Sequence, residues 1–224
     1  MPTSRFVKIA ALVAACAAAA PAAAQGYVDD AARKLELSPF GGVLWSSSVT
    51  AIPGTVTFRA SWDAGLTLGF PVDERSVVEI LYLYGRPEAQ FTSRSASWTS
   101  SPWFPVTSQY LQIGGTTSFA TTERLEPFLA GGLGVAWLSP SSFTSQAQAT
   151  IQPADTWLFA WHLGLGLKWW ASSAVGLRDE ARVLLPTYFS SGTFLSGPNG
   201  AALTVNAGIP FVQGDLALAV VFAP

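Results

Sequence analysis

The 224-residue sequence predicts an all-β protein in which eight antiparallel strands close into a transmembrane barrel. The first observation behind this prediction is the composition. Half of the residues are hydrophobic and 12% are charged, whereas about a quarter are charged in soluble domains. The second is that the longest charge-free stretch, residues 127–154, is interrupted by proline, glycine and serine, unlike the roughly 20 apolar residues of a spanning helix. A closed barrel is the other structure that satisfies its backbone hydrogen bonds within a bilayer.

The third observation is a strict period of two in FRASWDAGLTLGF, residues 58–70. Its even positions are apolar and its odd positions are polar or glycine, which is the pattern of a strand with one apolar face. The alternation returns in residues 128–138, 157–170 and 216–222, and aromatic residues gather near the expected strand ends, as in the girdles of membrane barrels. The first strand, residues 35–45, is less regular because Pro39 and the Gly41-Gly42 pair interrupt it.

Evenly spaced turns set the number of strands. Short turns are expected at residues 73–76, 121–126 and 171–174, and their midpoints lie 49 residues apart. The 200 residues after position 24 therefore divide into four units of two strands. Longer connections rich in Ser, Thr, Gly and Pro are expected at residues 46–57, 93–107, 140–155 and 190–214. Short turns on one side and long loops on the other are typical of bacterial membrane barrels.

The N-terminus predicts export. Arg5 and Lys8 precede an alanine-rich apolar run that ends in Ala22-Ala23-Ala24, an A-x-A cleavage site, so residues 1–24 are interpreted as a signal peptide. Residues 25–34 would form a short periplasmic segment and residues 35–224 the barrel. The remaining chain has 10 basic and 14 acidic residues and no basic patch, which argues against nucleic acid as a partner. Cys16 is lost with the leader unless it is lipidated in a lipobox formed with Val13-Ala14-Ala15. The mass of the N-terminal peptide distinguishes these outcomes.

The glycine-rich strand 131–135 and the strand 176–186 resemble those of small eight-stranded bacterial outer-membrane barrels of the OmpA-barrel, OmpX and OmpW kind. The resemblance covers residues 35 to the end. It implies periplasmic turns, extracellular loops, contact with outer-membrane lipid, insertion by the barrel-assembly machinery and a monomer. One departure is the C-terminus: such barrels usually end on an aromatic residue, whereas Ala223 and Pro224 follow Phe222 here.

The polar strand faces predict a charged interior. An eight-stranded barrel is just wide enough for side chains to fill it, and charges confined there must pair. The turn at 171–174 would place Gly166 and Gly164 across from Glu180 and Arg182, where the glycines make room for long side chains. We interpret the interior as a plug of ion pairs, with a narrow ion path as the alternative. The expected members are Glu36, Arg59, Asp63, Glu79, Lys168, Arg178, Glu180, Arg182 and Asp215.

The expected loops contain apolar side chains that could pack on the barrel mouth or contact a small hydrophobic ligand or a surface partner: Trp98, Trp103, Phe104, Phe194 and Phe211. The predicted function is therefore structural, or surface interaction, or passage of small apolar solutes, without catalysis and without a cofactor. The single histidine, His162, and the lack of cysteine after the leader argue against a His- or Cys-based metal site. Two alternatives remain. One is a membrane-embedded lipid-modifying hydrolase that uses His162, and the other is a soluble exported barrel of the lipocalin type.

Overall fold

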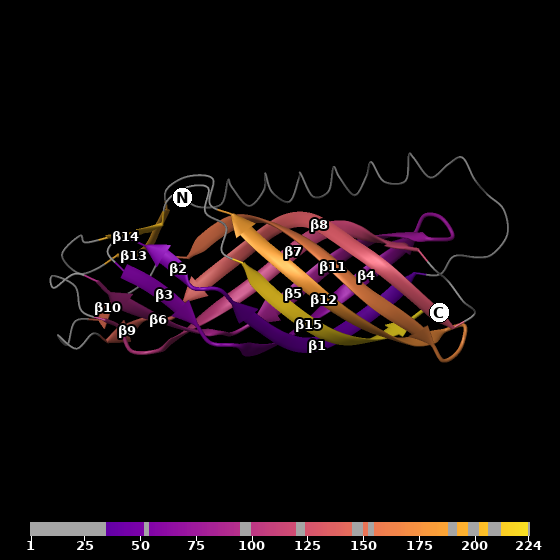
Figure 1. Ribbon diagram of the computed structural model, residues 1–224, viewed down its shortest axis with the longest axis horizontal. Helices are drawn as coiled ribbons and strands as arrows, with labels where there is room; N and C mark the ends of the chain where they lie inside the picture. The colour runs from indigo at the N-terminus through magenta and orange to yellow at the C-terminus, as the bar shows by residue number, and fades with distance from the viewer. Residues whose placement is uncertain are drawn as a thin grey trace, which may run out of the picture. The chain divides into compact units, whose positions relative to one another are not determined.

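The computed structural model describes residues 35–51, 54–94, 100–119, 124–144, 150–151, 155–187, 192–196, 202–205 and 212–223. Eight long strands form a closed antiparallel barrel (Figure 1). They are β1 (Glu36–Ser46), β4 (Ser61–Pro71), β5 (Ser76–Gly85), β7 (Phe104–Ser118), β8 (Leu125–Pro140), β11 (Thr156–Trp170), β12 (Val175–Thr187) and β15 (Gln213–Phe222). Each strand pairs with the next, and β15 pairs with β1 to close the barrel, with Phe40 opposite Ala219. The predicted fold class is confirmed.

Three short connections join β4 to β5, β7 to β8 and β11 to β12 at one end of the barrel, which we call the turn end. Side chains close two of these turns. Asp73 Oδ1 accepts hydrogen bonds from the backbone N–H groups of Arg75 and Ser76, both at 2.8 Å. Ser172 Oγ accepts from those of Ala174 and Val175. Asp and Ser favour turns because their short polar side chains bond to nearby backbone in this way. No helix among the described residues is long and apolar enough to span a membrane.

The opposite end, the loop end, carries additional short strands, most of them within the ranges expected to be loops. β2 (Val49–Ala51), β3 (Gly54–Phe58) and β6 (Glu88–Ser93) extend the wall of the barrel in the order β2-β3-β6-β7. Two further hairpins join β9 (Phe143–Thr144) to β10 (Thr150–Ile151) and β13 (Gly192–Ser196) to β14 (Ala202–Val205). The extension forms because Val56 and Phe91 continue the buried face beyond the barrel proper.

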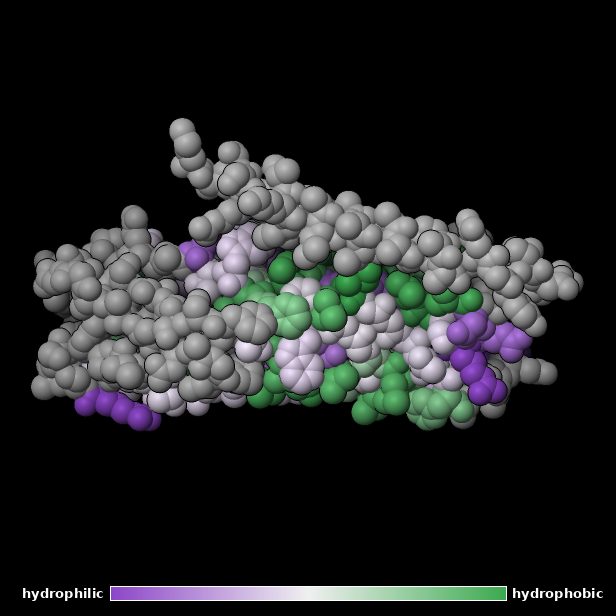
Figure 2. All heavy atoms as spheres, turned by 90° about the horizontal axis from the view of Figure 1, so that it is seen from above, coloured by the Kyte–Doolittle hydropathy of each residue, from purple (hydrophilic) through white to green (hydrophobic). Residues whose placement is uncertain are grey.

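The apolar strand faces point outward. Leu165 and Leu218 are 63% and 59% exposed, whereas Asp63 and Lys168 are 2% and 0% exposed. Apolar side chains cover much of the middle of the visible barrel face, and hydrophilic groups gather toward its ends (Figure 2). Exposed tryptophans such as Trp62 and Trp169 lie near strand ends. This arrangement suits a barrel surrounded by lipid and contradicts the lipocalin-type alternative, which requires an apolar interior and a polar exterior.

The interior has two layers, and this corrects the expectation of a wholly polar plug. Charged side chains fill the part toward the turn end, whereas the part toward the loop end is an apolar cluster. The apolar layer includes Leu44, Val56, Leu83, Phe91, Phe104, Val106, Tyr110, Leu138, Phe143, Leu158 and Leu184. It arises because strands such as β5 carry apolar residues on both faces near their loop ends, with Leu81 and Leu83 inside and Tyr82 outside. The apolar layer therefore closes the lumen above the charges.

Candidate functional site: the charged lumen

Eight of the nine residues expected in the lumen are buried there. They come from six of the eight barrel strands: Glu36 on β1, Asp63 on β4, Glu79 on β5, Lys168 on β11, Arg178, Glu180 and Arg182 on β12, and Asp215 on β15. Strict alternation on β12 brings three of them onto one face, two residues apart. The structure thus gathers charges that are distant in sequence into one buried group.

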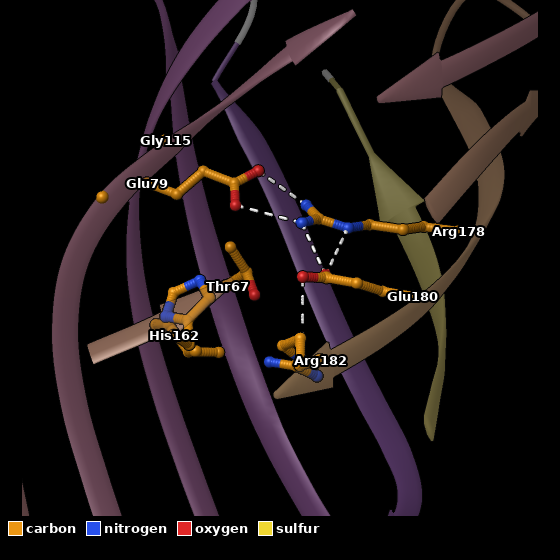
Figure 3. A pocket seen from close by; sticks show the side chains of 9 residues that line it. Thr67, Glu79, Gly115, His162, Arg178, Glu180 and Arg182 are labelled. Carbon is orange, nitrogen blue, oxygen red and sulfur yellow. Dashed lines mark hydrogen bonds and ion pairs between the residues drawn. The ribbon is translucent and has the colours of Figure 1, made fainter. Parts of the chain in front are cut away.

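Arg178 is the centre of this group (Figure 3). Its Nη1 and Nη2 donate to the two oxygens of Glu79 at 2.6 and 3.0 Å, which is a bidentate pair reaching from β12 to β5. Its Nε and Nη2 donate to Glu180 Oε2 at 3.1 and 2.7 Å. The guanidinium also lies over the ring of Phe128, 4.6 Å from its centroid. Four charge-assisted hydrogen bonds and an aromatic face make this the best-satisfied cation of the lumen.

The other two cations lie on either side of Arg178. Lys168 Nζ donates to Glu36 Oε2 at 2.7 Å near the turn end. Arg182 lies toward the loop end, with its Nε 3.7 Å from Glu180 Oε1 and 2.7 Å from Asp215 Oδ2. The contact with Asp215 is an ion pair by distance, but the N–H is not aligned for a hydrogen bond. The ring of Phe40 supports the Arg182 guanidinium from 4.4 Å.

Glycines provide the space for these side chains. Gly164 pairs with Arg182 and Gly166 with Glu180, as the sequence analysis expected. A Cβ atom on Gly164 would lie 2.8 Å from Glu180 Oε1, and one on Gly166 would lie 2.4 Å from the ring of Phe128. A larger residue at Gly164 would therefore displace Glu180, and one at Gly166 would displace the Phe128 ring on which the Arg178 guanidinium lies.

Solved structures of similar shape share this architecture. The crystal structure of Neisserial surface protein A matches with a TM-score of 0.51 and 12% identity, covering 85% of this chain and 97% of that chain. The outer membrane protein OprG from Pseudomonas aeruginosa matches with a TM-score of 0.51 and 13% identity over 84% and 96% of the two chains. The outer membrane protein AlkL, solved in lipid bilayers, matches with a TM-score of 0.51 and 16% identity over 89% and 97%.

The chain has the fold of a small eight-stranded outer-membrane barrel. No protein-family model matches the sequence, and no curated protein matches it either. At these identities the similarity establishes the fold alone. The chemistry of the chain must therefore be argued from its own side chains.

Arg59 is not in the lumen, which corrects the sequence analysis. The expected single strand 58–70 is broken at Arg59 and Ala60, between β3 and β4. The Arg59 side chain is 57% exposed at the rim of the loop end, where Nη1 donates to Glu88 Oε2 at 2.9 Å. Its guanidinium covers the ring of Trp103, 4.0 Å from the centroid. β3 leaves the barrel to pair with β6, so the period of two does not carry Arg59 inward.

His162 is buried beside the ion pairs, and its Nδ1 lies 2.8 Å from Gln112 Oε1. It lines a cavity of about 10 Å³, the size of one water molecule, together with Thr67, Glu79, Arg178, Glu180 and Arg182 (Figure 3). Sequence reasoning missed Gln112, although the alternation of β7 places it on the inner face. Among the described residues, no group of three or more His, Cys, Asp or Glu side chains could hold a metal ion.

The aromatic residues predicted to contact a ligand or partner at the loop end lie in different surroundings. Phe104, expected as a possible ligand contact, is buried in the apolar layer and stacks on Phe143 with centroids 4.6 Å apart. Trp103 is half-buried beneath Arg59. Trp98 and Phe211 lie outside the described residues, and Phe194 lies in β13, whose side chains are not described. Of the five residues predicted as loop contacts, the two whose side chains are described therefore lie in different places, Phe104 in the apolar layer and Trp103 at the rim.

Proposed function

We propose that the protein is an outer-membrane barrel with a closed lumen, which holds its loop-end strands at the cell surface in a structural or surface-interaction role. One observation carries the proposal: buried ion pairs join strands on different sides of the barrel, and an apolar layer lies directly above them. The barrel is therefore a rigid support rather than a conduit.

The ion pairs argue against conduction because each cation is already bound. A hydrated ion passing Arg178 would have to displace the bidentate contact with Glu79, whose oxygens lie 2.6 and 3.0 Å away. It would then have to cross the apolar layer, in which Leu44, Leu83 and Leu184 are each 0% exposed. Stripping water from an ion in such surroundings costs several kcal/mol or more.

The cellular arrangement follows from the expected leader. Residues 1–24 would direct export, the turn end would face the periplasm and the loop end the outside, and the barrel-assembly machinery would insert the monomer. The extended wall β2-β3-β6 would then stand above the membrane, with Arg59, Glu88 and Trp103 on its rim. The charged pair and the aromatic ring would form a contact surface for a polar partner.

Planar-bilayer recording of the refolded protein tests the closed lumen. Electrophoresis with and without boiling first establishes that the barrel has folded, since small folded barrels migrate differently from the heated chain. We expect bilayers that contain the folded protein to show no steady channel openings at either polarity of the applied voltage. Steady openings of large conductance would overturn the proposal.

Uptake by cells separates the surface role from passage of small apolar solutes. Cells with and without the protein are given a labelled alkane, and surface exposure is established by protease treatment of intact cells. Equal uptake supports the surface role. Faster uptake in the expressing cells would replace it with passage of apolar solutes.

A further inference from the structure

Two aspartates meet in the lumen across the strand that separates them. Asp63 on β4 and Asp215 on β15 both point inward, and β1 lies between their strands. Asp63 lies opposite Gly42 of β1 and Asp215 lies opposite Leu44 of the same strand, so the two inward side chains flank one short stretch of β1. Gly42 of β1 makes the approach possible, because a Cβ atom there would lie 2.6 Å from Asp63 Oδ1.

Hydrogen-bond donors for this pair are missing among the described residues. Asp63 and Asp215 are 2% and 0% exposed, and none of their four carboxylate oxygens accepts an aligned hydrogen bond. Arg182 Nε lies 2.7 Å from Asp215 Oδ2, but it also lies 3.7 Å from Glu180 Oε1, so its charge is divided between two carboxylates. Five buried carboxylates share three buried cations in this lumen, so two carboxylates lack a cation of their own. Glu180 shares Arg178 with Glu79, whereas the other carboxylate forms no ion pair with a described residue. Asp63 is that carboxylate.

The surroundings offer little else that could neutralise the pair. β1 contributes Phe40, Gly42 and Leu44 nearby, and β5 contributes Leu83 and Gly85, none of which ionises. On β7, Tyr110 donates its hydroxyl to Gln213. Among the residues that the structure describes, the other charged or titratable side chains toward the pair are Arg182 and Glu180 on β12, His162 on β11 and, deeper in the lumen, Glu79 on β5 and Arg178 on β12.

We propose that Asp63 and Asp215 hold one proton between them, as a carboxyl–carboxylate hydrogen bond that links β4 to β15 across β1. Two ionised carboxylates in contact within a low-dielectric interior repel each other strongly, and sharing a proton converts that repulsion into a hydrogen bond. Arg182 then stabilises the single remaining charge. The site is a proton-binding site that does not depend on the role of the protein at the cell surface.

The sign of the pH effect follows from counting protons. In the unfolded chain both aspartates are solvated and ionise near pH 4, so at neutral pH the folded barrel holds one proton more than the unfolded chain. The shared proton makes its full contribution to the stability of the folded barrel below about pH 4. Above that pH the folding equilibrium constant falls by about tenfold per pH unit. The fall ends where the folded pair releases the proton.

Asp63→Asn tests the proposal because asparagine has the shape of the protonated side chain and supplies a permanent N–H donor to Asp215. Wild type and variant are unfolded by urea in lipid vesicles at several values between about pH 5 and pH 8. We expect the folding equilibrium constant of the variant, relative to wild type, to rise about tenfold per pH unit. Because both proteins contain His162, its contribution to the pH dependence cancels in the ratio of their equilibrium constants. The control Asp155→Asn, at a carboxylate bonded to Ser139 outside the lumen, should leave this ratio independent of pH.

Infrared difference spectra provide a second measurement that does not require the variant to fold. Wild type at neutral pH should show the carbonyl stretch of a buried carboxylic acid, and raising the pH should remove it. Asp63→Asn and Asp215→Asn should each lack that band. A ratio of equilibrium constants that does not change with pH, or a wild-type spectrum with no carboxylic acid band, would overturn the proposal.

Discussion

Replacing Arg178 by methionine should be among the most damaging single changes in the barrel. The substitution keeps most of the side-chain volume and its contact with Phe128, but it removes four charge-assisted hydrogen bonds. Glu180 keeps Arg182 at 3.7 Å, whereas Glu79 keeps only a contact from Thr116 Oγ1 at 3.5 Å. Breaking a buried ion pair by removing one partner costs about 3–5 kcal/mol, which is a factor of a few hundred to a few thousand in the folding equilibrium constant.

Urea unfolding in lipid vesicles, followed by tryptophan fluorescence, measures this loss. The matched control is Arg59→Met, which removes an arginine from an ion pair with Glu88 on the exposed rim and should cost no more than about 1 kcal/mol. Adding Glu79→Gln and Glu180→Gln to Arg178→Met should restore most of the stability, since the two carboxylates that lost Arg178 are then neutral amides. Equal losses for Arg178→Met and Arg59→Met would refute the argument that the buried ion pairs of Arg178 contribute more to stability than an exposed pair at the rim.

Three further substitutions, two of them with a matched control, test the packing and the orientation of the barrel by the same unfolding measurement. Gly166→Ala should destabilise by about 1–3 kcal/mol through overpacking, because its Cβ would lie 2.2 Å from Asp179 O. Gly41→Ala, whose nearest contact would be 3.8 Å away, should be close to neutral, and equal effects would contradict the packing. Leu165→Arg should cost about 2–4 kcal/mol at mid-membrane, with Val72→Arg at the turn end as a nearly neutral control. Phe104→Ala should cost about 3–5 kcal/mol as a core truncation; a loss below 1 kcal/mol would return Phe104 to the loop surface.

The strands and the direction of their faces could be predicted because both depend on local pattern. A period of two is visible within a dozen residues, and Asp73 and Ser172 mark turns by their own hydrogen bonds. The pairing of Gly164 with Arg182 also followed, since a tight turn at 171–174 determines the register of the two strands it joins.

Other features depend on contacts that no local pattern reveals. Alternation continues unbroken through Arg59, so nothing in residues 58–70 marks the point where β3 leaves the barrel to pair with β6. β5 carries apolar residues on both faces near its loop end, so the apolar layer could not be told from the lipid-facing band. The partners of the charges were also hidden, because Arg178 and Glu79 lie 99 residues apart on strands that are not neighbours.

The most direct test of the account is photolabelling of the native protein by a diazirine-bearing phospholipid, because it reports which leucines face lipid. Leu163, Leu165 and Leu218 are 59%, 63% and 59% exposed, whereas Leu44, Leu83 and Leu184 are 0% exposed. All six are leucines, so differences in intrinsic reactivity are removed. Adducts are expected on the first three leucines and none on the last three. Adducts on the inner leucines with none on the outer ones would show that the apolar faces turn inward, and the membrane-barrel interpretation would be wrong.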